Sequence, residues 1–383
     1  MSLPKLSIFS CGLLIFLAGH AEADWTVEPY AKSALTLDDN IRFSTTDAES
    51  SAGLVLDSGA VFSNETEAVK TRVAPKLTYR AYSSDSDINS LDQYLDFSTT
   101  SFGERSDLGL NLFFANDTTL ISELDDSGIT SINKRRRHFS MVPSWRYLLT
   151  QRLSLFVKYR FDGFQYEDSG ENGLYDFEYQ FAGVDVERKI SEDSDFITRL
   201  KYQRYKALEL TNKANTAGLE LGYKKRFSSR LEAKIFVGGE TTDSTIQDDE
   251  TTKRSISAKV GVAYQQELQR ISAELASGIV PSSTGEVYTE NSLSLKTDAR
   301  ISDVLSWRLS ARIQKRDVVN ESSTQVGRTY YTVSPTLLWR YSREWTFGAS
   351  YALSEESLEG SEGASRNQIY ISTEYRKLKT TLY

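Results

Sequence analysis

Cysteine and histidine are scarce in this sequence. Its one cysteine is Cys11, and only one of its two histidines, His138, lies beyond residue 23. Without a thiol, residues 24–383 can form no disulfide, zinc–thiolate site or cysteine nucleophile, and a single histidine cannot build a histidine-cluster metal site. We therefore expect neither a metal ion nor another cofactor.

Long hydrophobic runs are also missing. No stretch of about 18 consecutive apolar residues occurs, which is the least that a membrane-spanning helix requires, and the mean hydropathy is −0.42. The 6 prolines and 22 glycines are too few for a disordered linker. The 21 Tyr, 18 Phe and 5 Trp instead favour β-strands.

The first 23 residues differ from the rest of the chain. Lys5 precedes an apolar run from Cys11 to Ala18, and Ala21-Glu22-Ala23 forms a small-x-small cleavage site. This pattern is typical of a secretory signal peptide. We predict a signal peptide over 1–23 and a single exported domain over 24–383.

After residue 23, apolar and polar residues alternate with a period of two. From residue 151 onward the apolar positions are Leu153, Leu155, Val157, Tyr159 and Phe161, with Ser154, Lys158, Arg160 and Asp162 between them. Similar alternation recurs around 231–237, 256–264, 307–313 and 345–353. Such a pattern predicts strands with one apolar and one polar face.

Strand length and loop length distinguish a membrane barrel from a soluble sandwich. The alternating segments exceed the five or six residues of an average soluble strand, and transmembrane strands need about nine to eleven. Tight turns, such as Ser228-Ser229 and Ser342-Arg343, alternate with longer connections at 119–137, 241–251 and 320–327. Short turns at one end and longer loops at the other are typical of outer-membrane barrels.

The sequence therefore predicts an all-β fold: a transmembrane, antiparallel, up-and-down β-barrel. The expected strands are 25–37, 51–62, 67–81, 91–101, 104–117, 138–149, 151–166, 174–188, 195–209, 215–227, 229–243, 252–267, 269–280, 286–301, 304–318, 328–341, 344–357 and 366–379. An even number of strands predicts that both termini are periplasmic. Sixteen strands is the alternative, because 51–62 and 91–101 alternate weakly.

Two local features refine this expectation. Within 174–188 the apolar parity changes around Ala182-Gly183, which predicts a β-bulge. Aromatic residues beside the short turns at the lipid-facing parity predict a belt at the headgroup level, and they are Trp145, Tyr147, Trp307, Trp339, Tyr341 and Trp345.

The polar parity is rich in cations. If this parity faces the interior, the lumen-lining residues include Lys158, Arg160, Arg199, Lys201, Arg308, Arg312 and Arg340. Clustered Arg and Lys in a confined channel attract anionic solutes. The alternative is that neighbouring opposite charges, such as Lys158 and Asp162, pair across strands and only hold the wall together.

One basic run stands outside this pattern. Lys134, Arg135, Arg136 and Arg137 end the longest loop, where they are candidates for contact with lipopolysaccharide phosphates. Nucleic acid is the poorer interpretation, because the chain carries a net charge of −8 and is predicted to be exported.

Enzymatic motifs are absent, so we predict that the protein is not an enzyme. There is no Gly-x-Ser-x-Gly elbow, no Walker loop and no His-Glu-x-x-His. His138 shares the inward parity of Ser140 and is the only candidate for a general base of a barrel hydrolase. A lone histidine at a strand start is far more often interfacial than catalytic.

Three segments carry a further signal: Val27-Glu28-Pro29-Tyr30 through Asp38-Asp39-Asn40-Ile41, Val73 through Tyr82, and Val333-Ser334-Pro335 followed by Trp339-Arg340-Tyr341 and Arg343-Glu344-Trp345. They resemble the β-barrel porin 2 family of outer-membrane proteins that accompany exopolysaccharide export. The resemblance covers essentially all of 24–383, although its motifs are short.

This resemblance implies an outer-membrane pore that moves an exopolysaccharide or capsular polysaccharide. The implied partners are outer-membrane lipid and lipopolysaccharide, the polysaccharide substrate and a periplasmic polysaccharide export protein. The main alternative is a general or anion-preferring diffusion porin, which needs an inward-folded constriction loop. Residues 119–137 are long enough to provide one.

Overall fold

The computed structural model describes residues 24–126, 132–171, 173–247, 249–320, 323, 327–360 and 362–382. The predicted signal peptide lies outside these residues. The elements are β1 (Trp25–Asp38), β2 (Ser51–Glu65), β3 (Val69–Tyr82), η1 (Ser86–Ile88), β4 (Ser90–Phe102), β5 (Ser106–Thr118), α2 (Thr119–Asp126), β6 (Arg135–Thr150), β7 (Leu153–Tyr166), β8 (Phe177–Ser191), β9 (Ser194–Ala207), β10 (Lys213–Arg226), β11 (Leu231–Ile246), β12 (Asp249–Gln265), β13 (Gln269–Pro281), β14 (Val287–Arg300), β15 (Leu305–Val318), β16 (Arg328–Arg340), β17 (Trp345–Leu358), β18 (Ala364–Arg376) and β19 (Thr380–Leu382).

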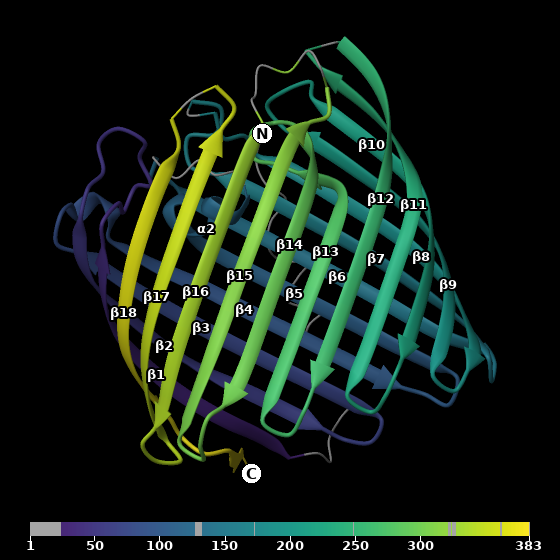
Figure 1. Cartoon of the computed structure of the whole chain (residues 1–383), viewed down its shortest axis with the longest axis horizontal. Coiled ribbons are helices and arrows are strands. Elements are labelled where there is room, and N and C mark those ends of the chain that lie inside the picture. Colours follow the sequence, from purple (N-terminus) through teal and green to yellow (C-terminus); the bar gives the residue numbers. More distant parts are fainter. Residues whose placement is uncertain are drawn as a thin grey trace.

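Eighteen strands close into one antiparallel barrel (Figure 1). Each strand pairs with its neighbours in sequence, and β1 pairs with β18 from Tyr30 opposite Arg376 to Asp38 opposite Gln368. The short β19 continues this seam, with Trp25 opposite Leu382. The predicted barrel with eighteen strands is thus confirmed, and the weakly alternating segments 51–62 and 91–101 form the strands β2 and β4.

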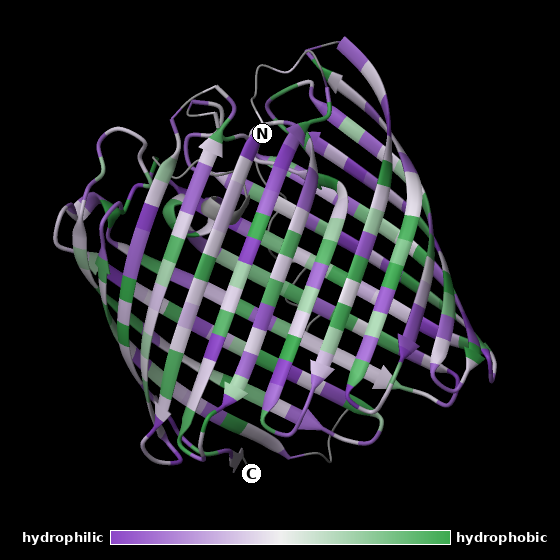
Figure 2. Ribbon diagram, viewed as in Figure 1, coloured by the Kyte–Doolittle hydropathy of each residue, from purple (hydrophilic) through white to green (hydrophobic). Residues whose placement is uncertain are grey.

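The outer face is apolar over the middle of the wall. Alternate residues along each strand are exposed and hydrophobic, as in Leu35 (63% exposed) and Leu37 (58%) on β1, whereas Ala34 and Thr36 between them are buried. Figure 2 shows this alternation on most strands. A continuous exposed apolar surface of this size is stable only in contact with lipid. Among the described residues, no helix is long and apolar enough to span a bilayer.

The two ends of the barrel differ. Short turns join the strands at the end where β1 begins and β18 ends, which we call the turn end. The opposite loop end carries longer connections, including 39–50 and the segment with α2. The expected long loop at 241–251 is instead mostly strand, because β11 and β12 continue to Ile246 and from Asp249.

The aromatic residues near the turn end contact one another on the outer face. The Trp145 and Tyr147 ring centroids lie 5.6 Å apart, as do those of Trp339 and Tyr341. Trp345 lies 5.1 Å from Tyr375.

The β-bulge predicted at Ala182-Gly183 is wrong. β7 and β8 pair without interruption through Tyr159 opposite Ala182 and Lys158 opposite Gly183. The apolar parity changes because Phe177 lies on the inner face of β8 and is buried, whereas Val186 lies on the outer face. Register shifts occur instead near the turn end, between Leu148 and Thr150 and between Lys189 and Ser191.

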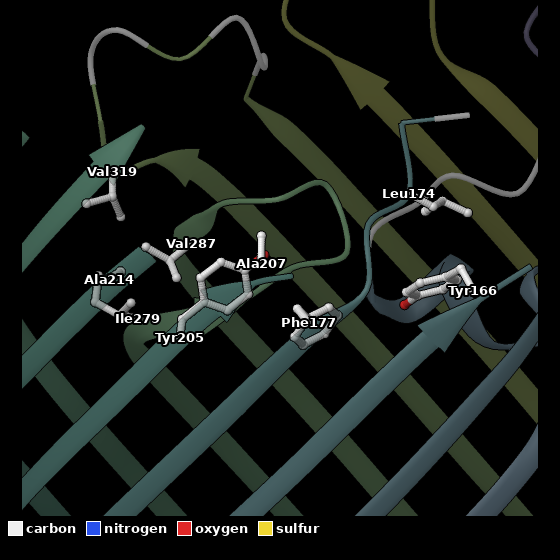
Figure 3. Packing of buried hydrophobic residues seen from close by; sticks show 9 residues of the cluster. All are labelled: Tyr166, Leu174, Phe177, Tyr205, Ala207, Ala214, Ile279, Val287 and Val319. Atoms are coloured by element: carbon white, nitrogen blue, oxygen red, sulfur yellow. The ribbon is translucent and has the colours of Figure 1, made fainter. Parts of the chain in front are cut away.

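The largest buried apolar cluster lies near the loop end. Tyr205 of β9 and Ala214 of β10 pack there against Ile279 and Val287, which flank the connection between β13 and β14 (Figure 3). Residues 282–288 are all buried. The tip of the β13–β14 hairpin therefore lies against the inner side of the wall formed by β9 and β10.

Candidate functional site

The inner face of the barrel is charged, and each side of it carries both paired and unpaired cations among the described residues. Strand pairing places Arg199 opposite Glu220, and Arg308 opposite Thr336 and Asp298. Residues that lie opposite one another on neighbouring strands share a face of the wall, which here is the inner one. The two sides of the lumen are therefore described in turn.

On the side formed by β7 to β11, most cations are neutralised. Arg199 contacts Asp185 at 2.7 Å, and Lys201 contacts Glu220 at 2.6 Å and Glu240 at 2.8 Å. These side chains are largely buried, so removing one partner would leave an uncompensated charge. This part of the wall behaves as the alternative hypothesis expected, with cations that hold the strands together.

Lys158 and Arg160 depart from the expected pairing. Asp162 accepts hydrogen bonds from Arg160 and not from Lys158, which forms no ion pair with a described residue. The side chain of Asp162 is only 1% exposed.

On the side formed by β14 to β18 and β1, Arg316, Arg328, Arg366 and Arg376 form ion pairs with acidic residues, but not every cation does. Arg312 and Arg340 form no ion pair with a described residue. Arg308 pairs with Asp298 at 2.8 Å, but both side chains are more than half exposed, so the pair is weak. A cavity of 720 Å³ lies along this wall, lined by Lys32, Arg308, Arg340 and Arg376, with Glu374 as its one acidic group.

Two connections cross the lumen at the loop end and meet at Glu123. This carboxylate of α2 is fully buried, and its oxygens accept hydrogen bonds from the Tyr166 hydroxyl at 2.8 Å and the Ser283 hydroxyl at 2.9 Å. Arg136 lies 3.4 Å away and compensates its charge. Because Ser283 belongs to the tip of the β13–β14 hairpin, the helix and the hairpin together narrow the channel.

The hairpin tip is fixed by further hydrogen bonds to the opposite wall. The Tyr205 hydroxyl donates to the Ser282 carbonyl at 2.8 Å, and the Asn212 amide donates to the Gly285 carbonyl at 3.0 Å. Gly285 has a φ of +87°, a conformation that only glycine adopts without strain. Burial raises the pKa of the neighbouring Glu286 carboxyl, which receives one hydrogen bond, from Ser323.

A row of aromatic rings runs along the inner wall beneath this constriction. The row begins with Phe113 and His138, whose ring centroids lie 5.3 Å apart, and His138 lies 4.0 Å from Phe164. It continues with 4.4 Å between Phe164 and Phe177 and 5.4 Å between Phe177 and Tyr205. Phe177 and Tyr205 are covered by the hairpin tip, whereas Phe113 and Phe164 are only partly buried.

His138 is part of a structural network and is not arranged for catalysis. Its Nε2 lies 3.1 Å from Asp162 Oδ1, and Ser140 also hydrogen-bonds to Asp162. In a nucleophilic triad the histidine must lie between the serine and the carboxylate. Here the carboxylate occupies the central position.

The basic run 134–137 is divided among several contacts. Lys134 pairs with Asp168, whose hydrogen bond raises the pKa of the lysine, and Arg135 pairs with Asp92 at 2.9 Å. Arg136 is buried against Asp117. Arg137 alone is exposed and without an ion pair to a described residue, so the proposed lipopolysaccharide contact is a prediction that concerns this residue above all.

Neither Glu123 nor Ser283 carries a local sequence signal of a site. The length of 119–137 suggests a constriction loop, and its described part does fold inward as α2. No local signal marks residues 282–286 as the other half of the constriction, because their hydrogen-bond partners include Tyr205 on β9, Glu123 on α2, and Tyr175 and Asn212 in the connections before β8 and β10.

Comparisons with known proteins give structural matches only. No family model matches the chain, and no curated protein sequence is significantly similar to it. The structure of OccK2 (OpdF) from Pseudomonas aeruginosa in complex with glucuronate matches with a TM-score of 0.50 and 12% identity, covering 94% of this chain and 99% of that one.

Two other matches are more distant. OccK5 (OpdH) from Pseudomonas aeruginosa gives a TM-score of 0.48 at 10% identity, covering 92% of this chain and 98% of that one. OccAB3 from Acinetobacter baumannii gives 0.46 at 12%, covering 94% and 100%. The chain thus has the fold of an outer-membrane porin, a closed antiparallel barrel of eighteen strands.

Proposed function

We propose that the protein is a diffusion porin of the bacterial outer membrane that prefers small hydrophilic anions. The observation that carries this proposal is the uneven pairing of the lumen charges. Arg312 and Arg340 form no ion pair with a described residue, and Arg340 lines a cavity with Lys32 and Arg308. Uncompensated cations in a narrow, water-filled passage raise the local concentration of anions.

The fold match supports the same substrate class. The OccK2 structure holds glucuronate, a sugar that carries one carboxylate. A solute of this kind would find a cation for its carboxylate and the Tyr370, Ser350 and Ser372 side chains for its hydroxyl groups in the 720 Å³ cavity. In this proposal the turn end and both termini face the periplasm, and no catalytic residue is required.

Export of a polysaccharide is the second candidate, and it rests on the resemblance to the β-barrel porin 2 family. A polymer needs an unobstructed path along the whole barrel. The contact between Glu123 and Ser283 crosses the lumen and favours small solutes over a polymer. If the barrel exports polysaccharide, a periplasmic export protein must dock at the turn end.

Ion selectivity tests the proposal. We would change Arg308, Arg312 and Arg340 together to Glu and measure the reversal potential of the purified barrel in a planar bilayer under a KCl gradient. The expected result is a shift from anion towards cation preference. The matched control is Lys315→Glu, because Lys315 carries the same charge and lies on the same strand as Arg308 and Arg312 but has the opposite parity.

An unchanged reversal potential in the triple variant would overturn the anion path along β15 and β16. Polysaccharide export is tested separately by deleting the gene and measuring polymer at the cell surface and in the periplasm. The proposal expects normal surface polymer. Periplasmic accumulation that complementation reverses would establish export instead.

A further inference from the structure

The β13–β14 hairpin leaves the barrel wall before it ends. β12 and β13 pair from Gln265 opposite Arg270 up to Ala258 opposite Ser277, and there the pairing stops. β13 nevertheless continues beside β14 to Pro281 opposite Val287. Residues 249–257 of β12 therefore pair with β11 alone, and no strand pairs with their other edge among the described residues.

The side chains of the hairpin tip show which face has turned inward. Ile279 shares the parity of Leu275, which is 52% exposed on the outer face of the barrel, yet Ile279 is 7% exposed. It packs in one cluster with Tyr205 and Ala214 on the inner side of β9 and β10 (Figure 3). If the tip continued in the wall, this face would contact lipid. In the structure it packs against the inner side of the barrel instead.

The unpaired edge of β12 offers the tip a second position. Continuing the β12–β13 register by two residues places Ile279 directly opposite Ile256. Ile256 is 72% exposed, the highest value among the large hydrophobic residues described. In that register the two isoleucines would form an outward-facing cross-strand pair, as β-branched residues favour.

We propose that the tip of the β13–β14 hairpin is a gate with two positions. In the inward position it fills the lumen between the β9–β10 wall and α2, as in this structure. In the wall position it extends the pairing of β13 along residues 249–257 of β12 and widens the passage. The exchange replaces one set of hydrogen bonds by another, which is how two states of one element remain close in free energy.

Contacts at both positions define what must change. The inward position is held by hydrogen bonds that include those from the Tyr205 and Asn212 side chains, from the Tyr175 amide to the Ser283 carbonyl, and from Ser283 to Glu123. To reach the wall position, the tip must also displace the end of β15, whose Val318 carbonyl accepts a hydrogen bond from Lys253 Nζ at 3.1 Å.

Gly278 is suited to be the hinge. It follows Ser277, the last β13 residue paired with β12, and a Cβ added at Gly278 would meet no atom within 4 Å. Glycine populates a wider range of φ and ψ than any other residue, so the backbone can change direction here.

Crosslinking tests the gate. Since 24–383 contains no cysteine, the pair Ile256→Cys and Ile279→Cys can be introduced and treated with a short bis-thiosulfonate reagent in lipid vesicles. We expect a crosslink that forms in the folded barrel, raises its conductance and is reversed by reductant. The control pair is Ile256→Cys with Leu275→Cys, which lies opposite Val260 and should stay unlinked.

A second variant keeps the test decisive. Adding Ser283→Ala removes the bond to Glu123, so crosslinking of the Ile256/Ile279 pair should become several times faster. Folding is checked for each variant by its heat-modifiable mobility on a gel. If the folded Ile256/Ile279 pair reacts no faster than the control pair, with or without Ser283→Ala, the two-position gate is wrong. This readout does not depend on which solute passes, so it can fail while the proposed ion selectivity holds.

Discussion

The hydroxyl of Ser283 donates a hydrogen bond of 2.9 Å to the carboxylate of Glu123, although 160 residues separate the two in the sequence. Glu123 lies on α2 after β5, and Ser283 lies after β13, almost halfway around the circuit of eighteen strands. A contact between these positions has to cross the lumen, so it narrows the channel at the loop end.

Removing the Ser283 hydroxyl should loosen this crossing. A hydrogen bond to a charged group contributes about 1.5–3 kcal/mol, and each 1.4 kcal/mol corresponds to a tenfold change in a population. We expect Ser283→Ala to increase the mean single-channel conductance and its fluctuations. Ser122→Ala is the control, because the Ser122 hydroxyl bonds to the Thr118 carbonyl, directly before its own helix, and to no other described residue. Equal traces for the two variants would contradict a role for the crossing contact.

Asp162 should contribute more to the stability of the fold than Asp298, whose ion pair is exposed. Asp162→Ala leaves Arg160 and His138 without their shared, buried partner, and breaking such a pair costs about 3 kcal/mol. Asp298→Ala breaks an exposed pair with Arg308, which contributes less than about 1 kcal/mol. Equilibrium unfolding in detergent micelles measures both. A loss for Asp162→Ala no larger than that for Asp298→Ala would show that the network around His138 is not stabilising.

Glu286 should make the hairpin position depend on pH. Burial raises the pKa of its carboxyl above the ordinary value of about 4.3, so the inward position binds a proton more tightly than a released hairpin does. The inward position is therefore favoured at low pH and loses stability as the pH rises through the raised pKa. Ser323 donates a hydrogen bond to Glu286, and the side chains of Tyr205 and Tyr288 interact with it.

Conductance recorded at increasing pH, starting near 4, measures this effect. We expect the conductance of the unchanged protein to increase with pH and the increase to be smaller in Glu286→Gln. Other acidic groups of the lumen contribute equally to both traces. Identical pH profiles would contradict the assignment to Glu286.

The five tryptophans should lie at one depth in the bilayer. Trp145, Trp339 and Trp345 are exposed on the outer face close to the turn end. Trp25 and Trp307 lie at the starts of β1 and β15, and each shares the parity of the outward-facing residues of its strand. Fluorescence quenching by lipids brominated at different positions should place them about 15 Å from the bilayer centre, at the edge of the hydrocarbon region. Strongest quenching at the centre would mean that the membrane boundary lies elsewhere.

The sequence by itself determined the barrel, its strand number and the face on which most side chains lie. Each strand of a membrane barrel contacts lipid on one side and water on the other, so residues such as Leu309 and Arg308 must alternate, and this period is local information. Turn residues such as Ser228-Ser229 mark the strand ends in the same local way.

The tertiary structure alone decided where that local pattern does not apply. Ile279 and Val287 carry an outward pattern but are buried, because the surface that covers them comes from Tyr205 and Ala214 on other strands. Phe177 suggested a bulge because inward-facing aromatic residues look like outward-facing ones in a sequence. Which cations are paired was equally undetermined, since Arg199 and Arg312 differ only in whether folding brings a carboxylate within reach. Contacts between distant segments depend on closure of the whole barrel, which no local pattern encodes.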